Sequence, residues 1–363
     1  MSVKISVVAA VAAMETVDMS IMRMAFPAAY VHDSQKVEFD VYEGGREIAL
    51  KGNFAEQSNV VNKDGYKTIT VNPMQINESI VDSAINVNKK RIGETVYGTT
   101  ESRTSDTEKR AIEDDAKGFG KLKKRVQRLV KKSMYDVLTT GKIIVSGENN
   151  AQDEIDYGLT NIIVNDNSTT GQYQWNDTTN SNPVEQLETE AEEMGQFAVD
   201  TYVLGLEAKK AFMSHPKVIT IDNTTIGKKA NFIQASKEER TAKSTQYMVY
   251  IGSTAGNYGK AVELYYEFEQ YVIGSTEYNY LNKNYVVGFR NANEENGQMQ
   301  YGNIPVASGD GEGATLDTYV GMEWIDGEIR KDPAGVKRYY KSSPLPTMNQ
   351  PKAYKSIKAT LIA

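Results

Sequence analysis

The chain has 363 residues, of which 40% are hydrophobic and 25% charged, which is typical of soluble proteins and long enough for about two or three domains. It contains no cysteine, which excludes disulfide frameworks, thiolate metal sites and cysteine nucleophiles. The net charge of -7 argues against a broad DNA-gripping surface, although it allows local basic stripes.

Residues 1–33 are interpreted as an N-terminal arm. An apolar run over residues 5–14 follows Lys4, and it has two interpretations. It could be the signal peptide of a secreted protein, or a short apolar helix or arm that packs on another surface. No stretch approaches the ~18 apolar residues of a membrane span, so no membrane partner is expected.

Residues 34–52 contain two runs of alternating apolar and polar residues on either side of Gly44-Gly45. Alternation with period two predicts half-buried strands, and a Gly-Gly pair suits a two-residue hairpin turn. The predicted hairpin places four side chains on one apolar face: Phe39, Val41, Ile48 and Leu50. A lone hairpin is marginal in water, so this face needs a partner, either the chain's own core or another subunit.

Residues 104–142 are predicted to form a long helix, because apolar residues recur at spacings of three and four. This stripe comprises Ile112, Ala116, Phe119, Leu122, Val126, Leu129, Val130, Ser133 and Val137. Acidic residues gather at its start and basic residues later, which suits the helix dipole. Gly141 fits a C-terminal cap, and Gly118 and Gly120 are candidates for a bend.

The middle of this helix carries a basic stripe, for which the sequence leaves two interpretations. Its residues are Lys117, Lys121, Lys124, Arg125, Arg128 and Lys132. It could be a solvated helix face, or a face that meets DNA or an acidic scaffold. Phe119 is the only aromatic residue interleaved with it, which argues against stacking on single-stranded bases.

The remaining elements alternate irregularly, which predicts an α+β fold rather than repeated βαβ units. We expect a strand–turn–strand over 142–158, a helix over 184–197, a buried strand over 201–206, a helix over 207–215, strands within 246–289, a loop over 290–315 and strands to the end. Asn182 and Pro183 suit the N-cap and first position of the first of these helices. Pro216 ends the second.

No motif predicts catalysis, a cofactor or a metal site. The two histidines, His32 and His215, lack a partner that would make either a base. Residues 252–260 superficially resemble a phosphate loop but lack its spacing, so a turn between strands is expected. Asp153, Glu154 and Asp156 could hold calcium but lack the spacing of an EF-hand loop.

Five segments, in this order, resemble the major capsid protein E family of lambda-like tailed phages. They are VEFDVYEGGREIA, GYKTITVNPMQINESIVDS, VLTTGKIIVSGENNAQDEIDYG, TYVLGLEAKKAFMSHPKV and SSPLPTMNQPKAYKSIKATLIA. The resemblance extends roughly over residues 30–363. It implies the Hong Kong 97-type capsid fold, an α+β fold with an N-terminal arm, an extended hairpin loop, a peripheral domain with a long spine helix, and an axial domain.

The resemblance also divides the chain. It implies an arm over 1–33, the extended hairpin loop over 34–105, the peripheral domain with its spine helix over 106–183, the axial domain over 184–330, and a C-terminal return to the peripheral domain over 331–363. The apolar face of Phe39, Val41, Ile48 and Leu50 would then lie across a neighbouring subunit.

The implied function is that of a major capsid protein, which self-assembles through pentamers and hexamers into an icosahedral shell around double-stranded DNA. The implied partners are further copies of the chain, a separate scaffolding protein, a portal, a decoration protein and non-specifically contacted DNA. The protein would occur in the virion, and in the host cytoplasm during assembly. The alternatives are another virion protein such as a tail tube, a nanocompartment shell, a secreted binding protein and, with least support, an enzyme.

Overall fold

The structure is a computed structural model that describes residues 17–42, 66–83, 100–146, 152–167, 173–218, 230–308, 315–331 and 334–360. Of residues 100–115 it describes the backbone only. The apolar run over 5–14, the Gly44-Gly45 turn, Ile48 and Leu50 lie outside the described residues. No helix among the described residues is long and apolar enough to span a membrane.

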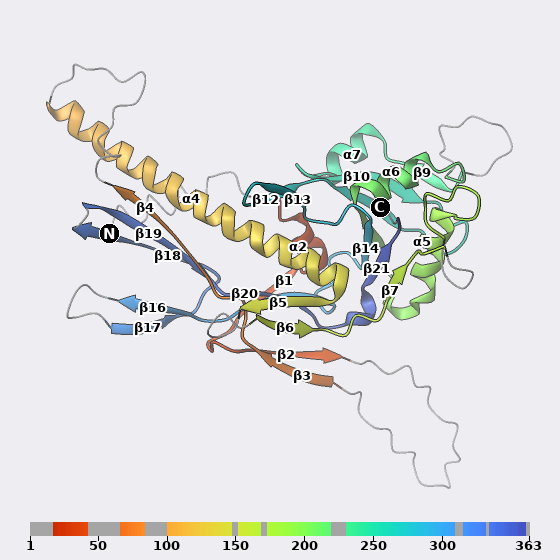
Figure 1. The fold of residues 1–363 in the computed structure, drawn as a ribbon, viewed down its shortest axis with the longest axis horizontal. Helices are drawn as coiled ribbons and strands as arrows, with labels where there is room; N and C mark the ends of the chain where they lie inside the picture. Colours follow the sequence, from red (N-terminus) through yellow and green to blue (C-terminus); the bar gives the residue numbers. More distant parts are fainter. Residues whose placement is uncertain are drawn as a thin grey trace, which may run out of the picture.

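One long helix crosses the molecule, one short helix packs beside it, and the other short helices gather at one end (Figure 1). The helices are α2 (Ser20–Ala25), α4 (Thr100–Thr140), α5 (Pro183–Glu193), α6 (Leu206–Ser214) and α7 (Lys237–Lys243), with 3-10 turns η2 (Gly195–Phe197) and η4 (Pro351–Ala353). One long helix, several short helices and many strands together make a mixed fold, which confirms the predicted α+β class.

The largest sheet has seven strands. Their order is β7 (Ile162–Val164), β21 (Lys355–Lys358), β14 (Tyr285–Phe289), β8 (Thr201–Leu204), β11 (Glu263–Glu267), β10 (Met248–Thr254) and β9 (Phe232–Gln234). The helices α5 and α6 bury Leu187 and Phe212 against it, in a core that includes Tyr202 and Val286. This sheet contains strands from both the predicted axial range and the ranges on either side of it.

Smaller sheets build the rest of the molecule along α4. The three-stranded sheets are β18 (Trp324–Lys331), β19 (Ala334–Ser342) and β4 (Ile76–Ser83), and β1 (Ala28–Val31), β15 (Gly297–Tyr301) and β20 (Pro344–Met348). The two-stranded sheets pair β2 (Val37–Tyr42) with β3 (Tyr66–Val71), β5 (Lys142–Ser146) with β6 (Gln152–Asp156), β12 (Gln270–Ile273) with β13 (Thr276–Asn279), and β16 (Ile304–Ser308) with β17 (Thr315–Tyr319).

The predicted long helix is confirmed as α4, whose 41 residues span about 60 Å. It starts at Thr100, earlier than expected, and Gly141 follows it with a φ of +70°. The helix is continuous at Gly118, where a Cβ atom would lie 3.1 Å from Cδ of Arg338, so this glycine accommodates a crossing side chain rather than a break. The stripe residues from Ala116 to Val137 are buried, with one exception. Leu129 is 44% exposed, contrary to expectation.

The prediction of a loop over residues 290–315 is partly wrong. It contains two five-residue strands, β15 and β16. Glycine and asparagine depress local strand propensity, but β15 lies between β1 and β20, so pairing on both edges overrides composition. By contrast, the predicted N-cap is confirmed, since Asn182 accepts a hydrogen bond from the Glu185 amide and Pro183 is the first helical residue.

Candidate assembly surfaces

The apolar side chains of β2, Phe39 and Val41, pack inside the chain rather than across a neighbouring subunit, whereas Ile48 and Leu50 of the same predicted face lie outside the described residues and their assignment stays a prediction. Phe39 and Val41 are 5% and 8% exposed, and the Phe39 ring lies 5.8 Å from that of Tyr157. In the described residues β2 pairs with β3, placing Phe39 opposite Ile69. The earlier interpretation failed because alternation identifies a buried face but not the body that buries it.

The basic stripe of α4 is less free than the sequence implies. Lys117, Lys121, Arg125 and Arg128 are exposed, and Lys124 and Lys132 are half-buried. Arg125 binds Glu78 of β4 through two hydrogen bonds of 2.9 and 3.3 Å, and Lys132 pairs with Asp136 one turn on. Arg128 and Lys121 form no ion pair with any acid in the described ranges.

Two further lysines of this helix bind acids across the fold. Lys123 lies 3.0 Å from Glu323, which also accepts a hydrogen bond from Tyr340. Lys131 is 1% exposed and contacts both Glu267, at 3.3 Å, and Glu269. No local feature of the sequence indicates these buried contacts, because Lys131 stands in a run of cations that all have the pattern of a solvated face.

The Lys131 cluster ties the middle of α4 to the end of β11. Tyr135 donates a hydrogen bond of 3.0 Å to Glu267, and the Lys131 ammonium lies 4.9 Å from the centroid of the Tyr280 ring. Burial raises the pKa of Glu267 to about 7, although Lys131 and the donated hydrogen bonds act in the opposite direction. The buried carboxyl of Glu267 and the partly buried carboxyl of Glu269 thus share one buried ammonium, so removing the ammonium would leave them uncompensated.

A shallow groove of about 300 Å³ lies between α4, β4 and the β12–β13 hairpin. Leu129, Val272 and Ile273 are exposed along it, at 44%, 60% and 59%. Three cations, Arg125, Arg128 and Lys132, and one acid, Glu78, also line it. Arg125 pairs with Glu78 and Lys132 pairs with Asp136, which leaves Arg128 without an ion pair to a described acid. The groove therefore combines exposed apolar side chains with one available positive charge, a combination that suits a protein partner better than a nucleic-acid backbone. We call it the α4 groove.

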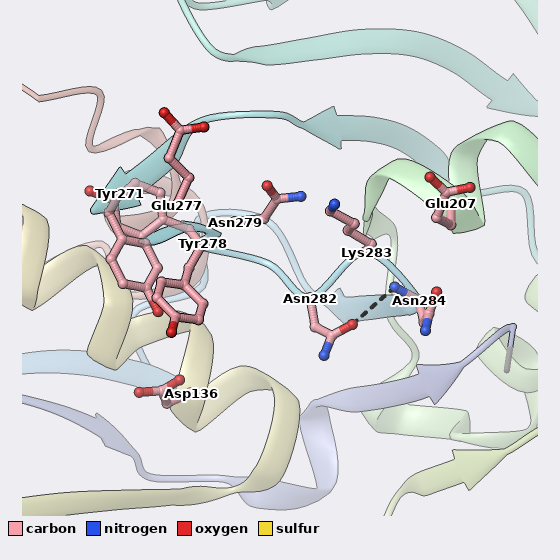
Figure 2. A pocket seen from close by; sticks show the side chains of 10 residues that line it. Asp136, Glu207, Tyr271, Glu277, Tyr278, Asn279, Asn282, Lys283 and Asn284 are labelled. Carbon is pink, nitrogen blue, oxygen red and sulfur yellow. Dashed lines mark hydrogen bonds between the residues drawn. The ribbon is translucent and has the colours of Figure 1, made fainter. Parts of the chain in front are cut away.

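A larger open cavity, of about 740 Å³, lies beside the other face of the same hairpin. Figure 2 shows Tyr271 and Tyr278 stacked at one end and Glu207 with Lys283 at the other. Glu207 pairs with Lys210 at 2.8 Å, and Asp136 is held by Lys132. Its acids are dispersed and partly neutralised, so nothing here resembles a paired-carboxylate catalytic site.

The segment that resembles a phosphate loop is a turn between β10 and β11, as expected. Its Gly256 and Tyr258 amides both donate hydrogen bonds of 2.7 Å to the carboxylate of Glu188. Glu188 is fully buried on α5. The amides that would bind a phosphate therefore already hold an anion, which fastens this turn to the helix.

His215 has a hydrogen-bonded neighbour that the sequence did not indicate, Ser181, 3.0 Å from Nε2. The Lys217 amide donates to Nδ1, which leaves Nε2 as the protonated nitrogen, donating to the serine. Ser181 donates in turn to the Asp177 carbonyl. Since Nε2 cannot then accept the serine proton, the arrangement is structural; burial lowers the pKa of His215 and favours its neutral form.

The candidate calcium segment also has an internal partner. Glu154 and Asp156 lie 2.7 and 3.2 Å from the Lys142 ammonium, across the β5–β6 hairpin. Across the part of the chain that the structure describes, no three histidine or carboxylate side chains gather closely enough to hold a metal ion.

The comparisons with known proteins agree with this architecture. The family model of phage major capsid protein E matches residues 6–359. A prophage capsid protein of Escherichia coli CFT073 has a similar structure, with a TM-score of 0.62 and 17% identity over 99% of this chain and 98% of that chain. The mature capsid of bacteriophage PhiM1 gives a TM-score of 0.47 and 8% identity over 93% and 85%. No curated protein matches the sequence significantly.

The predicted resemblance is therefore confirmed, and with it the Hong Kong 97-type capsid fold. The protein is a structural component of a tailed-phage virion and not an enzyme, and copies of it build a multimeric shell. The family match covers nearly the whole chain, from residue 6 to residue 359, just after β21. The chain belongs to the phage major capsid protein E family.

Proposed function

We propose that this capsid protein assembles through pentamers and hexamers into an icosahedral shell around double-stranded DNA. The observation that carries the proposal is the family match over residues 6–359. Repeated heterologous contacts around closed rings make a shell stable even when each contact is weak, because every subunit makes several. Assembly would take place in the host cytoplasm with a separate scaffolding protein, and portal and decoration proteins would join the shell.

Negative-stain electron microscopy of the purified protein tests this, first expressed alone and then with a scaffold encoded beside its gene. Closed particles, or rings of five and six subunits, are the expected result. A monomer under both conditions, at all salt and protein concentrations tested, would contradict the proposal. Open tubes would instead favour a tail-tube protein.

We propose further that the exposed cations of α4 contact a polyanion in the assembled particle, either packaged DNA or an acidic scaffold. Exposed Lys121, without an ion pair in the described ranges, supports this role. Binding would be independent of sequence and weaken with salt. The internal pairs of Arg125 and Lys132 make the contact smaller than the sequence implies.

The variant Lys121→Glu tests this proposal, with Lys237→Glu on the exposed face of α7 as a matched control. We expect Lys121→Glu alone to reduce duplex DNA binding and its salt dependence, if DNA is the polyanion. Reduced scaffold incorporation with unchanged DNA binding would identify the scaffold. Unchanged behaviour in both assays would refute a polyanion contact at this lysine.

A further inference from the structure

The strand β17 and the residues after it form an exposed apolar edge. Every residue from Leu316 to Val320 is exposed, and Leu316 is 94% exposed. Its partner β16 is anchored through buried Ile304 and Val306, whereas the other edge of β17 pairs with no described strand. A two-stranded ribbon with an open apolar edge is marginal and prone to association, so a functional protein needs to cover it.

The α4 groove exposes apolar side chains and a cation that could complement the exposed edge of β17. It exposes Leu129, Val272 and Ile273, which are as apolar as the edge of β17. Its Arg128 is exposed and has no ion pair with a described acid. Asp317 of β17 is likewise exposed and, in the described ranges, its carboxylate accepts only the Thr318 amide beside it. Exposed apolar side chains and a charge without an ion pair are thus found on both surfaces.

The two surfaces cannot meet within one chain. Figure 1 shows β16 and β17 on one side of α4 and the β12–β13 hairpin on the other, well separated in the plane of the view. The groove is lined by α4, β4 and β12, with no residue of β17. A contact between them therefore requires a second copy, and it joins two different surfaces, which is the heterologous geometry that generates rings.

We propose that the edge of β17 in one copy docks in the α4 groove of the next copy, with Leu316 and Val320 against Val272 and Ile273, and Asp317 facing Arg128. The inference rests on the proposed function, since it names one contact by which the subunits assemble. It assigns Arg128 to a second copy of this chain, whereas Lys121, which does not line the groove, is left for the polyanion.

Cross-linking between copies tests the contact directly, because the chain has no cysteine of its own. The variants Leu316→Cys and Ile273→Cys change exposed side chains and should fold normally. We expect a short bismaleimide to produce a cross-linked dimer when assembled particles contain both variants in mixture, and no dimer when either is present alone. The double variant should give a ladder of multimers, since each copy touches two neighbours.

The matched control replaces Leu316→Cys by Ile144→Cys, whose side chain is 59% exposed on β5, away from the proposed contact. Its mixture with Ile273→Cys should give no dimer. Particles that assemble normally but show no Leu316–Ile273 cross-link would overturn the contact and leave the capsid function standing. Failure of the unmodified protein to form particles or rings would instead count against the capsid function.

Charge exchange gives an independent test. The variants Asp317→Arg and Arg128→Asp should each raise the critical concentration for assembly by about tenfold or more, because each opposes like charges. Their combination should return it to within about threefold of the unmodified value. Equal losses in the single and combined variants, with all three folded by circular dichroism, would refute the pairing.

Discussion

Replacing Lys131 by methionine should destabilise the subunit more than any other change of one charge on α4. Lys131 is the only cation that contacts the carboxyls of Glu267 and Glu269 in the described structure, and both it and Glu267 have side chains 1% exposed. When both carboxyls and the ammonium are ionised, the cluster has a net charge of about -1, and the substitution changes this net charge to about -2. Breaking a buried pair by removing one partner costs about 3–5 kcal/mol.

The assay is urea unfolding of the unassembled subunit at pH 8. With a urea m-value of about 3 kcal/mol/M or less, this loss shifts the midpoint by at least about 1 M. Lys132→Met is the matched control, because the side chains of Lys132 and its partner Asp136 are 33% and 44% exposed, and ion pairs open to solvent contribute about 1 kcal/mol or less.

The pH dependence follows from the same cluster. Without the ammonium, the pKa of Glu267 would rise further above its ordinary value, so both carboxyls would be more protonated at pH 5 than at pH 8. The loss caused by Lys131→Met should therefore be smaller at pH 5. A loss below about 1 kcal/mol at pH 8, or equal losses in Lys131→Met and Lys132→Met, would refute the account of this cluster.

Four other changes give separate predictions. Phe39→Ala should lower the free energy of unfolding of the isolated subunit by about 3–5 kcal/mol, since its ring is in the core; a loss of assembly alone would restore the subunit-interface interpretation. Asn182→Ala should cost about 1 kcal/mol in the same assay through loss of a cap, and no loss would show that the cap is dispensable. Gly141→Ala should cost at least about 1 kcal/mol, since its φ is +70° and the new Cβ would lie 2.3 Å from that of Leu159; a melting temperature as high as the unmodified protein's would contradict this. Because the pKa of Glu267 is raised to about 7, the unmodified subunit should lose about 2.5 kcal/mol as the pH rises from 5 to 8 relative to Glu267→Gln, and parallel pH profiles would disprove it.

Local features of the sequence predicted the elements that local physics determines. The spacing of apolar residues located α4, and Asn182 and Gly141 marked helix ends through their backbone preferences. Leu129 was misplaced because it has helical spacing yet lies over a groove rather than over the core. Of the two strands within 290–315, β15 was missed since its partners β1 and β20 lie far away in the chain. In contrast, β16 pairs with the nearby β17, and it was missed because the glycine- and asparagine-rich composition of this range was interpreted as a loop.

The surfaces were harder to predict than the elements. Nothing local distinguishes buried Lys131 from exposed Lys121, because burial depends on Glu267 and Glu269, more than a hundred residues away. Similarly, Phe39 alternates as a strand residue should, but the ring that covers it belongs to Tyr157. The α4 groove combines side chains of α4, β4 and β12, and only the folded chain brings them together.

Cryo-electron microscopy of particles assembled from the purified protein tests the claim that this chain builds a closed capsid. We predict an icosahedral reconstruction in which the subunit fold occupies both fivefold and sixfold rings, with neighbouring copies in heterologous contact. Particles with a single ring symmetry stacked into tubes, or no particles in the presence of a scaffold, would contradict the claim.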